Sequence, residues 1–402
     1  MAVRGIYSDL EKKMLETFEK DSESREGWSK PATGMEAAFN LAGSPHVTAA
    51  MVQEYGVSND PWNPFWHDAA WATASRWGGL IAHPWFAADR FKPLEKMLES
   101  PRGRFLTFYL MGHDLEIYQP IRPGDTIRAW LKRPTLEDVT DPNGKEPRRF
   151  HYIDVWTEMF NQRDECIFSL KQYIDITIYE GAPKADKWLS DYGYTPQELE
   201  YLAQIYETEK PRGSHVRFWE DVNVGDLLPP VTTGPTPPAN LIAPPPPKPG
   251  EVPKRVFPRP VEPTGGPIMF GYIPDRKTGL WYPTQGGRHN SDRAAQFEGG
   301  PRAWIYNYVS RGIMCRCVTN WMGDDAFMCK FGWRHIWRTP LGDTLIAHGK
   351  IIRKYIENAE HLVDIRLWCL NLRGTITDMA TTTLKLLSRE DPFPNYPKVI
   401  NR

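Results

Sequence analysis

Apolar and polar positions follow helical spacing in the first part of the chain. Residues 7–20 place apolar side chains three and four positions apart with charges between them, which predicts a helix. Residues 46–56 predict a second helix that ends at Gly56. An aromatic, Pro-rich loop follows, and residues 69–91 predict a turn and a buried helix.

The pattern then changes to β-strand spacing. Runs rich in β-branched and aromatic residues, with alternating stretches, predict strands at 105–111, 113–120, 125–133, 148–162 and 166–179. Pro-Gly and Asp-Pro-Asn-Gly turns separate several of these runs. One central helix followed by an antiparallel meander predicts an α+β fold.

The second half repeats this order. A polar stretch contains a predicted helix near 195–207, and a new unit opens at residue 218. A loop at 282–301 leads into a predicted buried helix within 302–325. The predicted strands that follow are 326–338, 343–356, 361–373 and 379–388.

These patterns divide the chain into four parts. The predicted parts are a helical appendage at 1–40, a first module at 41–182, a connecting segment at 183–215 and a second module at 216–402. Within the second module, residues 229–267 are so rich in proline that they must be extended. They are either a solvated linker or an arm that covers part of a cleft.

Composition narrows the class of protein. With 49 basic and 50 acidic residues in 402, the charge does not favour nucleic-acid binding. No apolar run approaches the roughly 18 residues of a membrane span, and the N-terminus lacks a signal-peptide core, so we expect a cytoplasmic protein. The five cysteines are interpreted as buried thiols. The absence of CxxC, HExxH and GxGxxG motifs predicts neither a metal nor a redox cofactor.

Two pairs of turns indicate an internal duplication. Gly124-Asp125 and Gly342-Asp343 each open a strand, and glycine accepts the positive φ of a tight turn. An Asn-x-Arg turn follows in each half, at 161–163 and at 371–373. The repeated order of both signals predicts two copies of one module.

A central helix wrapped by an antiparallel sheet, with a Gly-Asp-Thr turn, resembles the hotdog fold. The duplicated chain resembles the two-domain, double-hotdog type of the MaoC-like dehydratase and (R)-specific enoyl-CoA hydratase family, with a fatty acid synthase-like dehydratase domain at the N-terminus. Residues 60–84, DPWNPFWHDAAWATASRWGGLIAHP, are similar to the family's Asp-x-Asn-Pro-x-His-x-Asp loop and to the Ala-His-Gly that opens its helix. The resemblance covers nearly the whole chain and implies an α+β double hotdog.

The resemblance also assigns positions. In the family, the loop histidine lies six residues before an alanine and about 17 before the helix-opening histidine. His289 lies six residues before Ala295 and 17 before Tyr306, so the resemblance places His289 at the catalytic position. In the first half, Trp66 occupies that position and His83 the later one.

The chain departs from the family at the catalytic aspartate, which lies five residues before the histidine. Those positions hold Thr284 and Pro61 here. Asp60 is one position away and is a candidate substitute. Asp292, three residues after His289, is a second candidate: it either orients the imidazole or only caps the following helix.

The helix-opening glycine is also replaced. Pro84 in the first half has no N–H to donate, whereas Asn307 in the second half has one, which favours the second half as the working site. Tyr306, His83 and Asn63 are the candidate substrate-binding residues. His83 alternatively bonds only a main-chain carbonyl, and Asn63 alternatively belongs only to a turn.

The resemblance implies chemistry on acyl thioesters. Hydration of a 2-enoyl-CoA, or dehydration of a 3-hydroxyacyl-CoA, needs a base for water, an acid for Cα and donors for the thioester oxygen. His289 is the expected base, and the amide of Asn307 at a helix N-terminus is the expected donor. A hotdog thioesterase and a non-catalytic acyl-CoA-binding subunit remain alternatives. We expect acyl-CoA as the partner, no cofactor, no nucleic acid, no membrane, and a homodimer.

Overall fold

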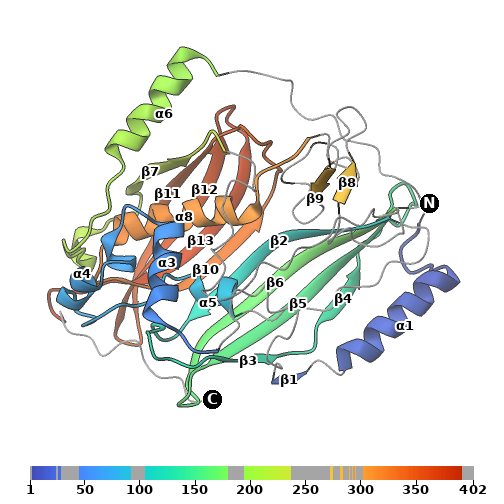
Figure 1. The fold of residues 1–402 in the computed structure, drawn as a ribbon, viewed down its shortest axis with the longest axis horizontal. Coiled ribbons are helices and arrows are strands. Elements are labelled where there is room, and N and C mark those ends of the chain that lie inside the picture. Colours follow the sequence, from blue (N-terminus) through green and yellow to red (C-terminus); the bar gives the residue numbers. More distant parts are fainter. Residues whose placement is uncertain are drawn as a thin grey trace.

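Two half-sheets join into one continuous sheet in the computed structural model of the chain (Figure 1). The structure describes residues 2–23, 26–28, 45–91, 105–179, 194–236, 272–274, 281–283, 289, 292, 295 and 302–391. Within these residues the main sheet runs in the order β1-β3-β5-β6-β2-β10-β13-β12-β11-β7, and β4 pairs with β5. All of its neighbouring strands are antiparallel.

The first module supplies one half of this sheet. Its strands are β1 (Gly27–Trp28), β2 (Phe105–Ile117), β3 (Arg128–Leu131), β4 (Thr135–Asp138), β5 (Arg148–Phe160) and β6 (Cys166–Tyr179). Its helices are α1 (Asp9–Glu23), α3 (Ala49–Asn59), η1 (Pro64–Trp66), α4 (Ala69–Ala74) and α5 (Phe86–Arg90).

The second module supplies the other half. Its strands are β7 (Leu227–Thr233), β10 (Phe327–His335), β11 (Leu345–Glu357), β12 (Glu360–Asn371) and β13 (Ile376–Lys385), and β8 (Tyr272–Pro274) pairs separately with β9 (Trp281–Pro283). Its helices are α6 (Pro196–Thr208), η2 (Trp219–Asp221) and α8 (Asn307–Met322). Helix α8 lies against the second half of the sheet in Figure 1 and packs on β7, β11, β12 and β13. Most of its side chains are buried.

Main-chain hydrogen bonds confirm the predicted internal duplication. In the first module the N–H of Ala82 donates to the carbonyl of Ile121 at 2.8 Å, and in the second module Ile305 donates to Thr339 at the same distance. The residue after each donor therefore occupies the same place in its module. His83 is therefore equivalent to Tyr306, and Pro84 is equivalent to Asn307, in agreement with the alignment of the two halves in the sequence.

The repeated turns behave alike. Gly124 has φ +96° and Gly342 has φ +84°, so both turns use the left-handed conformation that glycine tolerates. The Asn-x-Arg turns are also alike. In each one the side-chain oxygen of the asparagine, Asn161 or Asn371, accepts the N–H groups of the residues two and four positions later. The sequence signals for duplication thus mark equivalent structures.

Most predicted elements are confirmed in kind, with differences at their ends. The two strands expected at 105–111 and 113–120 are one strand, β2, which stays continuous through an irregularity between Leu110 and Gly112. The helix expected to end at Gly56 continues to Asn59. A Cβ on Gly56 would lie 2.5 Å from the carbonyl oxygen of Trp66, so this glycine permits close packing rather than ending the helix.

The proline-rich segment is described only at its beginning. Pro229 and Pro230 lie in β7 at the edge of the sheet, where a strand has no need of every N–H. The remainder of 229–267 beyond residue 236 lies outside the described residues, so the choice between linker and arm stays open. No helix in the described part of the chain has the length and apolar character needed to cross a membrane.

The two modules also meet through a buried ion pair. Arg311 on α8 is 2% exposed and donates from Nη2 to both carboxylate oxygens of Asp89 on α5, at 2.8 and 2.6 Å. Its guanidinium lies 3.9 Å from the ring centre of Trp85. Together with the β2–β10 pairing, this contact fixes α8 against the first module.

Candidate active site

The N-terminus of α8 lies at the junction of the modules. Tyr306 is its N-cap residue, and Asn307 begins the helix. The Asn307 side chain donates from Nδ2 to the carbonyl of Leu110 on β2 at 2.9 Å. The first N–H groups of a helix have no acceptor within it and carry partial positive charge. The end of α8 therefore offers main-chain donors beside a strand of the other module.

His289 lies against this helix end. It is 2% exposed, and its Nδ1 is 2.7 Å from the carbonyl oxygen of Trp304. A carbonyl can only accept, so Nδ1 carries the proton and Nε2 is the basic nitrogen of the neutral ring. The ring centres of His289 and Tyr306 are 4.0 Å apart. The structure thus brings together three predicted residues, His289, Tyr306 and Asn307.

Asp292 does not supply the bond that fixes His289. Its side chain is exposed, and Oδ1 accepts the N–H of Ala303 at 2.8 Å. The orienting hydrogen bond comes instead from the main-chain carbonyl of Trp304. Asp292 does not cap α8 either, because the N-cap residue of that helix is Tyr306 and Ala303 lies before the helix begins.

Asp60 lies near the other end of α8. Its Oδ2 accepts from Thr319 Oγ1 at 3.0 Å and from the indole N–H of Trp66 at 3.2 Å. Burial raises the pKa of Asp60 to about 6, against the lowering effect of the Arg316 guanidinium. Thr319 is about 18 Å along the helix from Asn307 at 1.5 Å per residue. Asp60 therefore cannot serve as the partner of His289.

His83 and Asn63 belong to the interior around Asp60. His83 Nδ1 accepts the N–H of Trp85 at 3.3 Å, and burial lowers the pKa of His83 to about 3, so its ring stays neutral. Asn63 caps η1 by accepting the N–H of Phe65. The proposed substrate-binding roles of His83 and Asn63 have no support from these contacts, because both side chains hold local structure.

A second polar group beside α8 was missed by the sequence reasoning. His335 Nδ1 is 2.8 Å from Asp378 Oδ1, and His335 Nε2 is 2.7 Å from the hydroxyl of Tyr109. Asp378 Oδ1 also accepts from Ser310 Oγ at 2.9 Å and from the Trp333 indole N–H at 3.0 Å. Ser310 is in the first turn of α8, so this network adjoins the helix end that His289 faces.

The sequence contains a weak signal for this network. In β10 and β13, His335 and Asp378 each lie two residues from a buried strand neighbour, Trp333 and Ala380. A polar residue at an inward-facing position of a strand is unusual and costs free energy unless it is paired. Their pairing depends on strand register, which the alternation alone does not give.

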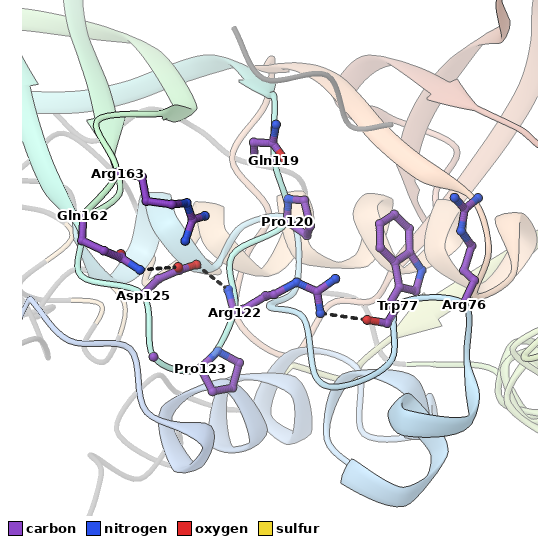
Figure 2. Close-up of a pocket in the computed structure, with 10 residues that line it drawn as sticks. Arg76, Trp77, Gln119, Pro120, Arg122, Pro123, Asp125, Gln162 and Arg163 are labelled. Carbon is purple, nitrogen blue, oxygen red and sulfur yellow. Dashed lines mark hydrogen bonds between the residues drawn. The ribbon is translucent and has the colours of Figure 1, made fainter. Parts of the chain in front are cut away.

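The pocket drawn in Figure 2 is a separate feature of the first module. It has a volume of about 510 Å³ and is lined by residues of the Gly124-Asp125 turn together with Arg76, Arg122 and Arg163. Figure 2 shows Asp125 between the N–H of Arg122 and the amide of Gln162. Strand β2 runs roughly 25 Å from Tyr109 to this end of the module, at about 3.3 Å per residue. The pocket is therefore not part of the His289 region.

The buried thiols of α8 show no sign of reactivity. Burial raises the pKa of Cys315, and it raises the pKa of Cys317 to about 12. Among the described residues, no group of three His, Cys, Asp or Glu side chains is placed to hold a metal ion.

Comparisons with known proteins agree with this architecture. Residues 35–170 match the family model for the FAS1-like dehydratase domain region. The chain is similar to a solved MaoC-like dehydratase, with a TM-score of 0.53 and 15% identity over 91% of this chain and 99% of that one. No curated protein matches the sequence.

Two further solved structures resemble the chain with lower TM-scores. One is to a MaoC-like dehydratase from Phytophthora capsici, with a TM-score of 0.43, 11% identity and coverage of 87% of this chain and 98% of that one. Another is to a conserved hypothetical protein from Mycobacterium tuberculosis with a double hotdog fold, with a TM-score of 0.46, 10% identity and coverage of 85% and 92%. The predicted α+β double hotdog fold is confirmed.

Proposed function

We propose that this protein is an acyl-thioester hydratase or dehydratase, because residues 35–170 match the model of the FAS1-like dehydratase domain region and the chain has a double-hotdog fold similar to that of a MaoC-like dehydratase. Its proposed substrates are 2-enoyl-CoA and 3-hydroxyacyl-CoA thioesters. The observation that carries the proposal is His289, buried beside the N-terminus of α8 with its Nδ1 proton held by Trp304.

This placement suits the addition of water to a conjugated thioester. His289 Nε2 takes a proton from water, and the water oxygen bonds to Cβ as the double-bond electrons move toward the thioester. The N–H groups at the start of α8, including that of Asn307, stabilise the developing oxyanion. Protonation of Cα then completes the 3-hydroxyacyl product, and each step is reversed in dehydration.

The proposed reaction transfers only protons and water. We therefore propose that the CoA thioester is the sole small-molecule partner and that no cofactor takes part. We further propose a homodimer, which light scattering of the purified chain would test against a monomer. A mass equal to one chain would contradict this assembly.

One observation favours an alternative. The family aspartate is replaced at both equivalent positions, by Pro61 and Thr284, and Trp66 stands at the first catalytic histidine position. A chain with such losses could bind acyl-CoA without converting it. The thioesterase alternative differs in its product, because it would release free CoA.

The deciding experiment is a hydration assay on crotonyl-CoA, 2-octenoyl-CoA and cinnamoyl-CoA with the wild type, His289→Ala and the control His67→Ala. His67 is the matched control because it adjoins the equivalent position of the first module. We expect His289→Ala to lose about 10²–10⁴-fold in kcat, the usual contribution of an acid–base group, and the control to keep its activity.

The other outcomes separate the hypotheses. Unchanged turnover by His289→Ala would remove His289 from the site. Release of free CoA would indicate a thioesterase. Binding of these thioesters in calorimetry, with no turnover of any of them, would indicate the non-catalytic subunit.

A further inference from the structure

Three buried or half-buried polar side chains, one from the first module and two from the second, form a hydrogen-bonded row that the proposed reaction does not yet use. Tyr109 donates its hydroxyl proton to Nε2 of His335 when Nδ1 of that ring donates to Asp378, and the two distances are 2.7 and 2.8 Å. His335 is 7% exposed and Asp378 is 1% exposed. Tyr109 is half-buried and comes from β2 of the other module.

The first module serves as an internal control for this arrangement. His335 pairs with Asp378 across β10 and β13, and the equivalent pair across β2 and β6 is Ile117 with Phe168. The equivalence follows from the residues that come next. Tyr118 and Gln119 both donate to the carbonyl of Ile167, as Ile336 and Trp337 both donate to that of Thr377. The same fold position thus accepts an apolar pair.

Fold stability therefore does not explain the polar pair. Burying an ionisable pair costs desolvation, and an apolar pair of similar volume is often as stable or more so. Three donors converge on Oδ1 of Asp378, while Oδ2 has no hydrogen-bond partner among the described residues. A buried carboxylate retained at such a cost is a mark of functional sites.

The chain of side chains ends next to the helix terminus that His289 faces. Ser310 in the first turn of α8 binds Asp378, and Asn307 binds the carbonyl of Leu110, the residue after Tyr109. The rings of Tyr109 and His289 both neighbour Trp304, with ring centres 6.4 and 5.6 Å from it. His289 and the Tyr109–His335–Asp378 side chains therefore flank the main-chain N–H donors at the start of α8, and both can transfer protons.

We propose that Tyr109 is the acid–base residue for the Cα proton, and that His335 and Asp378 are positioning residues that hold its proton. This inference rests on the proposed hydratase function. It supplies the second acid–base group that the missing family aspartate would otherwise leave absent.

The steps balance in the dehydration direction. The Tyr109 oxygen accepts the Cα proton as its own proton moves to Nε2 of His335, and the new imidazolium is held by Asp378. The electrons of the broken Cα–H bond form the double bond. The Cβ–O bond breaks, and the leaving hydroxide takes the Nε2 proton of a His289 that begins this direction as imidazolium, so that water leaves and His289 becomes neutral. The proton on His335 then returns to His289 through solvent, and hydration is the reverse.

The test compares Tyr109→Phe and His335→Gln with the control Tyr118→Phe. Tyr118 lies in the first module next to the apolar pair, and its hydroxyl binds Glu116. Glutamine at 335 can keep both hydrogen bonds, to Tyr109 and Asp378, but it cannot take up a proton. It therefore separates a structural role from proton transfer, even if Tyr109→Phe folds poorly.

We expect both variants to lose about 10²–10⁴-fold in kcat with KM changed only a few-fold, and the control to match the wild type. With 3-hydroxyacyl-CoA deuterated at Cα, both variants should show a larger isotope effect than the wild type, because breaking the Cα–H bond becomes slower.

Two outcomes would overturn the inference in distinguishable ways. A wild type that turns over enoyl thioesters and loses activity in His289→Ala, but not in His335→Gln and Tyr109→Phe, overturns only the role of Tyr109. A wild type without any hydration or dehydration activity overturns the proposed function and this inference together.

Discussion

His335 Nδ1 lies 2.8 Å from Oδ1 of Asp378 in the interior of the second module, where the first module pairs Ile117 with Phe168. The duplicated fold thus carries an ionisable pair at one position and an apolar pair at its equivalent. Because both versions occur within one sheet, the energetic effect of the polar pair can be measured against residues that the same fold already accommodates.

Removal of one partner should destabilise the protein. We expect His335→Ala to lower the free energy of unfolding by about 3–5 kcal/mol, because it leaves the Asp378 carboxylate buried without its imidazole. The triple variant His335→Ile, Asp378→Phe, Ser310→Ala introduces the residues of the first module. It leaves the buried Trp333 indole without an acceptor, which costs about 1–3 kcal/mol, and it also removes the His335 acceptor of the half-buried Tyr109 hydroxyl.

Urea unfolding followed by tryptophan fluorescence would measure both variants. A triple variant that is at least as unstable as His335→Ala would contradict this account. It would show that the polar pair is needed for packing at this position.

Asp60 should make stability depend on pH between about 4 and 6. Burial raises its pKa from the ordinary 3.8 to about 6, so the folded state binds a proton that the unfolded state has lost. Its contribution to stability is present below pH 3.8 and is lost as the pH rises through 6. A shift of this size corresponds to about 3 kcal/mol at 1.36 kcal/mol per pKa unit.

Asp60→Asn should remove this dependence. The difference in unfolding free energy between the variant and the wild type should rise in favour of the variant from pH 4 to pH 7. Chemical unfolding at several pH values checks the sign, and a difference that stays constant would exclude a raised pKa at Asp60.

Two glycines within helices should respond oppositely to alanine. Gly56→Ala places a Cβ 2.5 Å from the main-chain oxygen of Trp66, and forcing it in should cost about 1–3 kcal/mol. Gly312 in α8 has no atom within 4 Å of an added Cβ, so Gly312→Ala should gain up to about 1 kcal/mol from helix propensity.

Thermal unfolding of the two alanine variants gives the comparison. Equal changes in Tm for both would show that helix propensity, rather than the contact with Trp66, decides the effect at Gly56.

Local signals in the sequence determined the modules and their repeat. The change from helical to alternating spacing located β5, β6, α6 and α8, because those periods depend on which faces of an element are buried. The Gly-Asp turns marked equivalent positions, because only glycine readily adopts the positive φ observed at 124 and 342. The spacing from His289 to Tyr306 correctly brought both residues to the start of α8.

Only the tertiary structure decided which polar groups meet. Asp60 was a candidate from its place in the loop, but packing sends it to Thr319, far along α8 from Asn307. Tyr109, His335 and Asp378 lie on three strands, and their contact depends on the β2–β10 and β10–β13 registers. Local spacing carries no information about such registers, because they are set by how distant segments of the chain pack together.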